Sequence, residues 1–176
     1  MKILRLVPLL LVLLLYSCNN KTSLQEYYVE HRVDTSFVAL DIPASLVLGD
    51  NSRLEPEQRA VIETIDKINL LGYPASEENK EVFEKEKLRL KKILADEKYQ
   101  TLMKFKSGTM SAELFYLGED DAIDELIVFG SDQTKGFGVA RVLGEDMNPE
   151  DLINLVHSLR NGNLDLEGLE ELLFKK

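Results

Sequence analysis

The sequence predicts an α+β domain: a mainly antiparallel sheet with a C-terminal strand meander and three to four helices packed on one face. Two observations predict this class. Apolar segments of strand length follow one another between residues 110 and 143, joined by short polar connections at 118–122 and 130–136, which favours an antiparallel meander. Apolar side chains at helical spacing mark the segments on either side of this block. Such an order of elements is typical of helices packed on an antiparallel sheet.

The N-terminus has the features of a targeting signal. Lys2 and Arg5 precede an apolar run, Leu6 to Leu15, which is near the length of a secretory h-region and well short of the ~20 residues of a membrane-spanning helix. The run closes as "LYSC", residues 15–18, which resembles a bacterial lipobox. The resemblance implies cleavage before Cys18, with lipid on its sulfur and an acyl group on the new amino terminus.

Two acylation signals hold a protein stably on a membrane, so a multiply acylated Cys18 is expected to be a permanent anchor. The alternative is an uncleaved signal or a free cysteine in a soluble protein. We therefore divide the chain into a lipoprotein signal peptide (1–17), a lipidated cysteine with its tether (18–35) and a single α+β domain (36–176). Residues 24–33 fit either a flexible tether or a short helix packed on the domain.

Composition excludes several functional classes. Removing residues 1–17 leaves 19 Lys and Arg against 31 Asp and Glu, a formal charge of −12. Nucleic acids and anionic membrane surfaces need a basic footprint, so neither is an expected partner of the folded domain. Cys18 is the only cysteine, which excludes disulfides within the chain and cysteine nucleophiles in the mature domain. No cofactor motif is present.

The first half of the domain alternates between strand and helix patterns. "SFVALDIP", residues 36–43, is apolar, includes β-formers and stops at a proline, which predicts a buried strand. From Pro56, a helix is predicted whose apolar face is Val61, Ile62, Ile65 and Ile68. "NLLGYP", residues 69–74, predicts a short strand after it.

The second half begins with the clearest helix. Ser76 is its expected N-cap, and its apolar face contains Val82, Phe83, Leu90, Ile93 and Leu94. "MSAELFYL" (110–117), "IDELIVFG" (123–130) and "FGVARVL" (137–143) are the three strand candidates of the meander.

Two helices are predicted at the C-terminus. Asn148 and Pro149 are expected to open the first, with Leu152, Ile153, Val156 and Leu159 as its buried stripe. Leu166, Leu169, Leu172 and Leu173 indicate a last short helix, which Gly168 weakens.

These ordered segments, with "ELFYLGEDDAIDELIVFGSD" and "FGVARVLGEDMNPEDLINL" as the longest, resemble the domain-of-unknown-function family 4252 over about residues 25–157. Its members are small envelope lipoproteins of Bacteroidota-type bacteria. The resemblance implies the same cellular address and fold class. Because no activity is assigned to that family, it implies no catalytic or binding residue.

Three groups of side chains are candidates for chemistry. An acidic turn with Asp120, Asp121 and Asp124, together with Glu145 and Asp146, offers oxygen ligands to a divalent cation, although a solvated acidic hairpin end is the commoner outcome. Asp41 lies within an apolar strand, and a buried carboxylate there would be a functional candidate, whereas a water-facing strand-end acid is the ordinary alternative. His31 and His157 are too few for a zinc site.

The sequence favours a non-enzymatic, lipid-anchored envelope protein that binds another protein, as an accessory of an assembly or of a stress-sensing arrangement. The alternative is a small periplasmic enzyme or ligand carrier that uses acidic residues. Residues 19–22 lack an acidic run of the kind linked to surface export in the resembling lipoproteins. The expected location is the outer membrane, on its periplasmic face, with the lipid on Cys18 as the membrane contact.

Overall fold

The computed structural model describes residues 22–43 and 55–160, and the side chains up to residue 154. Cys18, the signal segment and the predicted helix at Leu166–Leu173 lie outside the described residues. Within these ranges the chain forms four helices and six strands. The helices are α2 (Leu24–His31), α4 (Pro56–Glu63), α5 (Lys80–Leu94) and α6 (Pro149–Arg160). None of them combines the length and the apolar composition needed to cross a membrane.

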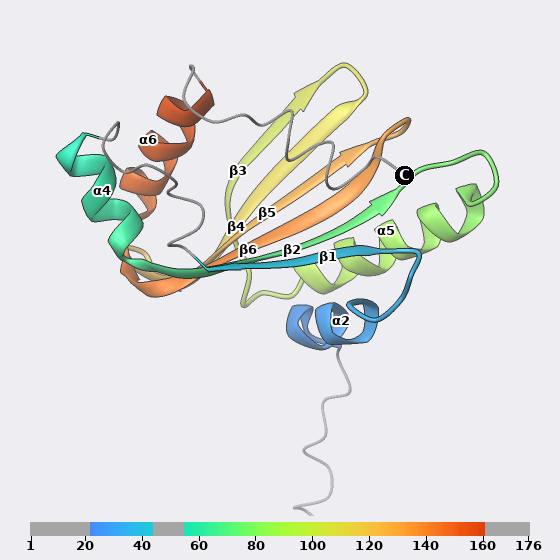
Figure 1. Ribbon diagram of the computed structural model, residues 1–176, viewed down its shortest axis with the longest axis horizontal. Coiled ribbons are helices and arrows are strands. Elements are labelled where there is room, and N and C mark those ends of the chain that lie inside the picture. Colours follow the sequence, from blue (N-terminus) through green and yellow to red (C-terminus); the bar gives the residue numbers. More distant parts are fainter. Residues whose placement is uncertain (1–21, 44–54, 161–176) are drawn as a thin grey trace, which may run out of the picture.

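The strands form one antiparallel sheet in the order β1-β2-β6-β5-β4-β3 (Figure 1). Four consecutive strands make the meander at the C-terminal side, and β2 and β1 extend it beyond β6. This arrangement confirms the predicted α+β class. The bounds are β1 Val38–Pro43, β2 Ile65–Pro74, β3 Gln100–Ser107, β4 Met110–Glu119, β5 Ala122–Asp132 and β6 Gly136–Met147.

The helices lie on both faces of the sheet, and not on one. Helices α2 and α5 cover what we call the α5 face, where Ile127 and Phe129 join the larger core cluster. Helices α4 and α6 pack at one end of the opposite surface, the α6 face, where Leu126 joins a second cluster with Leu152 of α6 (Figure 1). Successive strand residues point to opposite faces, so a run of consecutive apolar residues requires cover on both sides.

Helix α5 is amphipathic as predicted, but it starts one turn late. Its N-cap is Asn79, whose side chain does not bond the first helical amides but accepts a hydrogen bond from the Ser76 amide at 2.9 Å and donates one to the Pro74 carbonyl at 2.9 Å. Ser76 therefore belongs to the turn that leads into the helix. Phe83, Leu90 and Leu94 form its buried stripe, as the spacing indicates.

Helix α4 is shorter than its apolar spacing predicts. It ends at Glu63, and Ile65 and Ile68 belong to strand β2. Both are β-branched residues, which favour a pleated surface, and their neighbours Leu70 and Leu71 continue the same strand. The pairing of β2 with β6 sets the boundary between α4 and β2, and the local periodicity of the sequence contains no information about that pairing.

Residues 24–33 contain a packed helix, which settles the alternative that the sequence leaves open. Helix α2 begins with a complete capping box in which Ser23 and Glu26 bond each other's backbone amides. Leu24 and Tyr27 are only 1% and 0% exposed. The domain boundary expected at residue 36 therefore moves back to α2, because this helix buries its apolar side in the main core.

We predict that Leu90 is a major source of stability on the α5 face. Leu90→Ala should lower the free energy of unfolding by about 2–5 kcal/mol, because the side chain is fully buried and leaves a cavity. Chemical denaturation measures the loss. Leu88→Ala makes the same chemical change on the same helix at a side chain that is 68% exposed, and should cost less than about 0.5 kcal/mol. Equal losses in the two variants would contradict this packing.

Candidate functional site

Asp41 is a half-exposed acid that joins α2 to the sheet. Its carboxylate accepts hydrogen bonds from the Tyr28 hydroxyl at 2.8 Å and from the Asn69 side-chain amide. Arg32 lies 3.7 Å away, and 48% of the Asp41 side chain is exposed. Burial and this carboxylate raise the pKa of Tyr28 to about 12, so the phenol stays a donor at neutral pH. Asp41 is thus not the buried acid that would mark a catalytic group.

A buried ion pair lies beside this network under α2. Arg141 of β6 donates to both carboxylate oxygens of Glu125 on β5, at 2.6 and 3.1 Å. It also donates to the side chain of Gln25 on α2. Arg141 and Glu125 are 5% and 8% exposed, and each is satisfied by the other's charge. These contacts hold α2 in one position, and they leave no unpaired charge for chemistry.

His31 is a packing residue at the junction of α2 and α5. Its ring stacks on Phe37 with the centroids 4.2 Å apart, and its Nε2 lies 3.3 Å from a carboxylate oxygen of Glu86. Arg89 of α5 pairs with Glu30 in the same interface. The side chain of His157 lies outside the described residues. In the structure His31 therefore packs between α2 and α5.

The acidic residues considered for cation binding lie at one end of the sheet. Ile123, just after the β4–β5 turn, pairs with Met147 at the end of β6. Asp120 accepts a hydrogen bond from the Tyr116 hydroxyl at 2.7 Å. In the described ranges, however, no three His, Cys, Asp or Glu side chains are grouped so that they could hold a metal ion.

The sequence "LGED" occurs twice, at residues 117–120 and 143–146, and the backbone differs between the two places. In the first stretch, Gly118 has a φ of 118°, a value that residues with a side chain rarely adopt, and it leads into the β4–β5 turn. The second is a bulge inside β6, because the register with β5 shifts between Ile123 and Glu125. Gly144 is required there since a Cβ would lie 2.0 Å from the Thr64 carbonyl oxygen. The second stretch is therefore part of strand β6 and not a turn.

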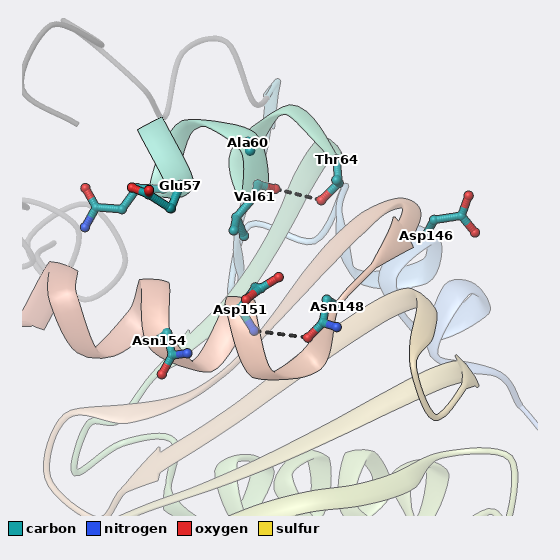
Figure 2. A pocket seen from close by; sticks show the side chains of 9 residues that line it. Glu57, Ala60, Val61, Thr64, Asp146, Asn148, Asp151 and Asn154 are labelled. Atoms are coloured by element: carbon teal, nitrogen blue, oxygen red, sulfur yellow. Dashed lines mark hydrogen bonds between the residues drawn. The ribbon is translucent and has the colours of Figure 1, made fainter. Parts of the chain in front are cut away.

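A cleft of about 650 Å³ separates α4 from α6 (Figure 2). Glu57, Ala60, Val61 and Thr64 line it from α4, and Asp151 and Asn154 line it from α6. Asn148 caps α6 by accepting from the Glu150 and Asp151 amides at 2.9 and 3.2 Å. Asp146 lies at the rim. None of the described lining residues carries a positive charge, so the cleft suits a neutral or cationic group.

Strand β3 is an exposed element absent from the predicted strands. All of its residues except Leu102 are exposed, and among the described strands it forms the edge of the sheet, next to β4. Met103 and Phe105 are 37% and 44% exposed, and Met110 at the start of β4 is 44% exposed. The alternation in "MKFK", residues 103–106, is the strand signal that identifies it.

We predict that the Tyr28–Asp41 hydrogen bond couples α2 to β1. Tyr28→Phe and Asp41→Ala should each lower the free energy of unfolding by about 1 kcal/mol, because each removes a part-buried hydrogen bond. A double-mutant cycle should give a coupling of about 0.5 kcal/mol or more. Asp66→Ala, at an exposed position of β2, is the matched control and should not couple to Tyr28→Phe. Additive losses for Tyr28 and Asp41 would refute the coupling.

Comparison with known proteins places the fold in a family. Residues 31–155 match the family model described as Domain of unknown function (DUF4252). The matched range contains the whole sheet with α4 and α5. No curated protein and no solved structure matches the chain. The resemblance found in the sequence is thereby confirmed, and the chain belongs to the DUF4252 family, whose function is unknown.

Proposed function

We propose that this protein is a lipid-anchored envelope protein that binds another protein through the edge of its sheet. The observation that carries the proposal is strand β3, an exposed edge with apolar side chains. An edge strand presents unpaired backbone N–H and C=O groups, and an extended segment of a partner can add to it as a further strand. By binding this partner, the protein acts as an accessory of an assembly or of a stress-sensing arrangement.

The side chains of β3 define the chemistry of that partner. Met103 and Phe105 lie on the α6 face, opposite Leu114 and Ala112 of β4. Lys104 and Lys106 alternate with them and point to the other face, where Lys104 lies 2.9 Å from Glu113. A complementary strand therefore has apolar residues at alternate positions and acids between them. We expect the partner segment to show this pattern.

The other edge of the sheet is less suited to strand addition. Strand β1 has 6 residues against 8 in β3, and it ends at Pro43, which has no amide hydrogen to donate. Its half-exposed Asp41 is already bonded to Tyr28 and Asn69. The asymmetry between the two edges supports β3 as the binding edge.

The anchor supports a role close to the membrane. Helix α2 fixes the chain to the core from Leu24 onward, so the connection from Cys18 is short. At no more than about 3.6 Å per residue, this connection holds the domain within roughly 20 Å of the lipid. We place the domain on the periplasmic face of the outer membrane, where its partner is another envelope protein.

The first prediction of this proposal concerns β3. A photo-crosslinking amino acid at Phe105, introduced in living cells, should trap one specific protein, which mass spectrometry identifies. The same amino acid at Leu88, which is 68% exposed on α5, is the matched control and should not trap it. When the crosslinking amino acid is placed at Met110 instead, Phe105→Lys should abolish the adduct that forms there. Identical adducts from positions 105 and 88, or none from 105, would refute binding at this edge.

The second prediction concerns the anchor. Cys18→Ser should move the protein from the membrane fraction to the soluble periplasmic fraction and abolish its labelling by a fatty-acid analogue. Cell fractionation and metabolic labelling measure the two effects. Ser17→Ala, which keeps a small residue before the cysteine, should leave both unchanged. A Cys18→Ser protein that stays in the membrane fraction would show that something other than lipid holds it there.

A second candidate function is a ligand carrier that uses the cleft between α4 and α6. The volume of about 650 Å³ and the apolar wall at Ala60 and Val61 favour it. Native mass spectrometry of protein purified from the envelope tests it. A bound small molecule that is absent from a Val61→Trp variant would support the carrier function. If both proteins show only the mass of the polypeptide, this candidate function is ruled out.

A further inference from the structure

The α6 face of the sheet is apolar far beyond the part that α4 and α6 cover. The strand register aligns one row of apolar residues across all six strands. This row consists of Leu40, Leu70, Ala140, Val128, Leu114 and Met103. The described helix residues reach only the neighbouring row, where Leu126, Tyr116 and Val142 contact the cluster around Leu152.

A shallow trough runs alongside this row. Gly72, Gly138, Gly130 and Ala112 align on β2, β6, β5 and β4, between Val38 on β1 and Phe105 on β3. A Cβ added at Gly130 would meet nothing within 4 Å. Small residues let another segment approach the backbone closely, and the apolar row beside them offers side chains to pack against.

Two leucines of this face are nevertheless shielded from solvent, whereas Val128 and Ala140 between them are half-buried. Leu70 and Leu114 are 6% and 8% exposed, although neither belongs to the core clusters formed with the described helices. At the β3 edge of the same face, Met103 and Phe105 stay exposed. The burial of these two leucines requires a cover that the described helices do not supply and that stops short of β3.

We propose that the C-terminal segment, residues 161–176, lies across the α6 face and provides this cover. The described chain ends at Arg160 of α6, which packs on that face, and 16 residues follow it. Extended, they reach up to about 55 Å, more than twice the roughly 24 Å between the outer strands. Leu166, Leu169, Leu172 and Leu173 repeat at helical spacing and supply the apolar side.

The segment between β1 and α4, residues 44–54, is the competing cover within the chain. It also contains apolar residues, Leu46, Val47 and Leu48. Both ends of this segment, however, lie at the end of the sheet that α4 covers. It starts after Pro43, whose neighbour Ile42 pairs with Ile68 near the start of β2, and it ends at α4 itself. The glycine row, which begins at Val38, lies at the opposite end of β1. The C-terminal segment is therefore the better occupant.

Engineered cysteine pairs test the proposal directly, because the mature chain with Cys18→Ser contains no other cysteine. Gly130→Cys with Leu169→Cys should form an intramolecular disulfide in most of the protein under mild oxidation, detected by gel mobility and mass spectrometry. Leu88→Cys with Leu169→Cys is the control: its cysteine on α5 is more exposed but on the wrong face, so it should stay unpaired. Gly130→Cys with Val47→Cys reports the competing segment.

Each alternative result overturns the inference. A disulfide with Val47→Cys in place of Leu169→Cys would assign the face to residues 44–54. A disulfide that links two molecules would assign it to a second copy. Equal reaction at positions 130 and 88 would mean that the segment does not lie on this face.

A second measurement does not depend on engineered disulfides. The full chain and a Leu169→Ser, Leu172→Ser variant are compared by the fluorescence of a dye that binds exposed apolar surface. The variant should bind several-fold more dye and melt at a lower temperature, whereas Glu170→Ser with Glu171→Ser should leave both values unchanged. Unchanged dye binding in the leucine variant would contradict the cover. Neither measurement involves β3 or a partner, so this inference stands or falls separately from the proposed function.

Discussion

Neighbouring residues along the central strands are apolar, as in Leu126–Ile127 and Val128–Phe129 of β5, and this makes both faces of the sheet apolar. Since alternate residues point to opposite sides, one layer of helices cannot bury such a strand. The arrangement of the domain follows from this constraint. Helices α2 and α5 close one face with an aromatic core, and α4 and α6 close one end of the other.

The polar side chains on the α5 face hold α2 in place on this apolar layer. Asp41, Asn69 and Arg141 pair directly across three strands, and Glu125 lies on the fourth, two residues before Ile127, the partner of Arg141. Gln25 of α2 bonds Arg141 from above this row. Hydrogen bonds satisfy them, so their burial costs little and fixes α2 in one orientation. The helix that follows the proposed anchor is thereby a fixed part of the domain.

The sequence predicts most of the elements because their signals are local. The three meander strands, the apolar stripe of α5 and the Asn148–Pro149 start of α6 occur where patterning and capping place them. The predictions that fail depend on distant partners. Ile65 and Ile68 fit a helical face, yet β6 pairs with them, and β3 has only the short alternation "MKFK" as a local signal, yet β4 pairs with it along most of its length.

The sequence by itself determined the acidic charge, the single cysteine within a segment that resembles a lipobox, and the α+β class, since each depends on residue identity or on spacing within one segment. The tertiary structure decided which strand is an edge, which face each helix covers and which polar residues meet. Gln25 and Arg141, for example, are 116 residues apart and bond only because α2 packs across β6. Strand order sets those contacts, and no local pattern encodes strand order. For the same reason, the edge at β3 and the apolar α6 face became visible only in the folded sheet.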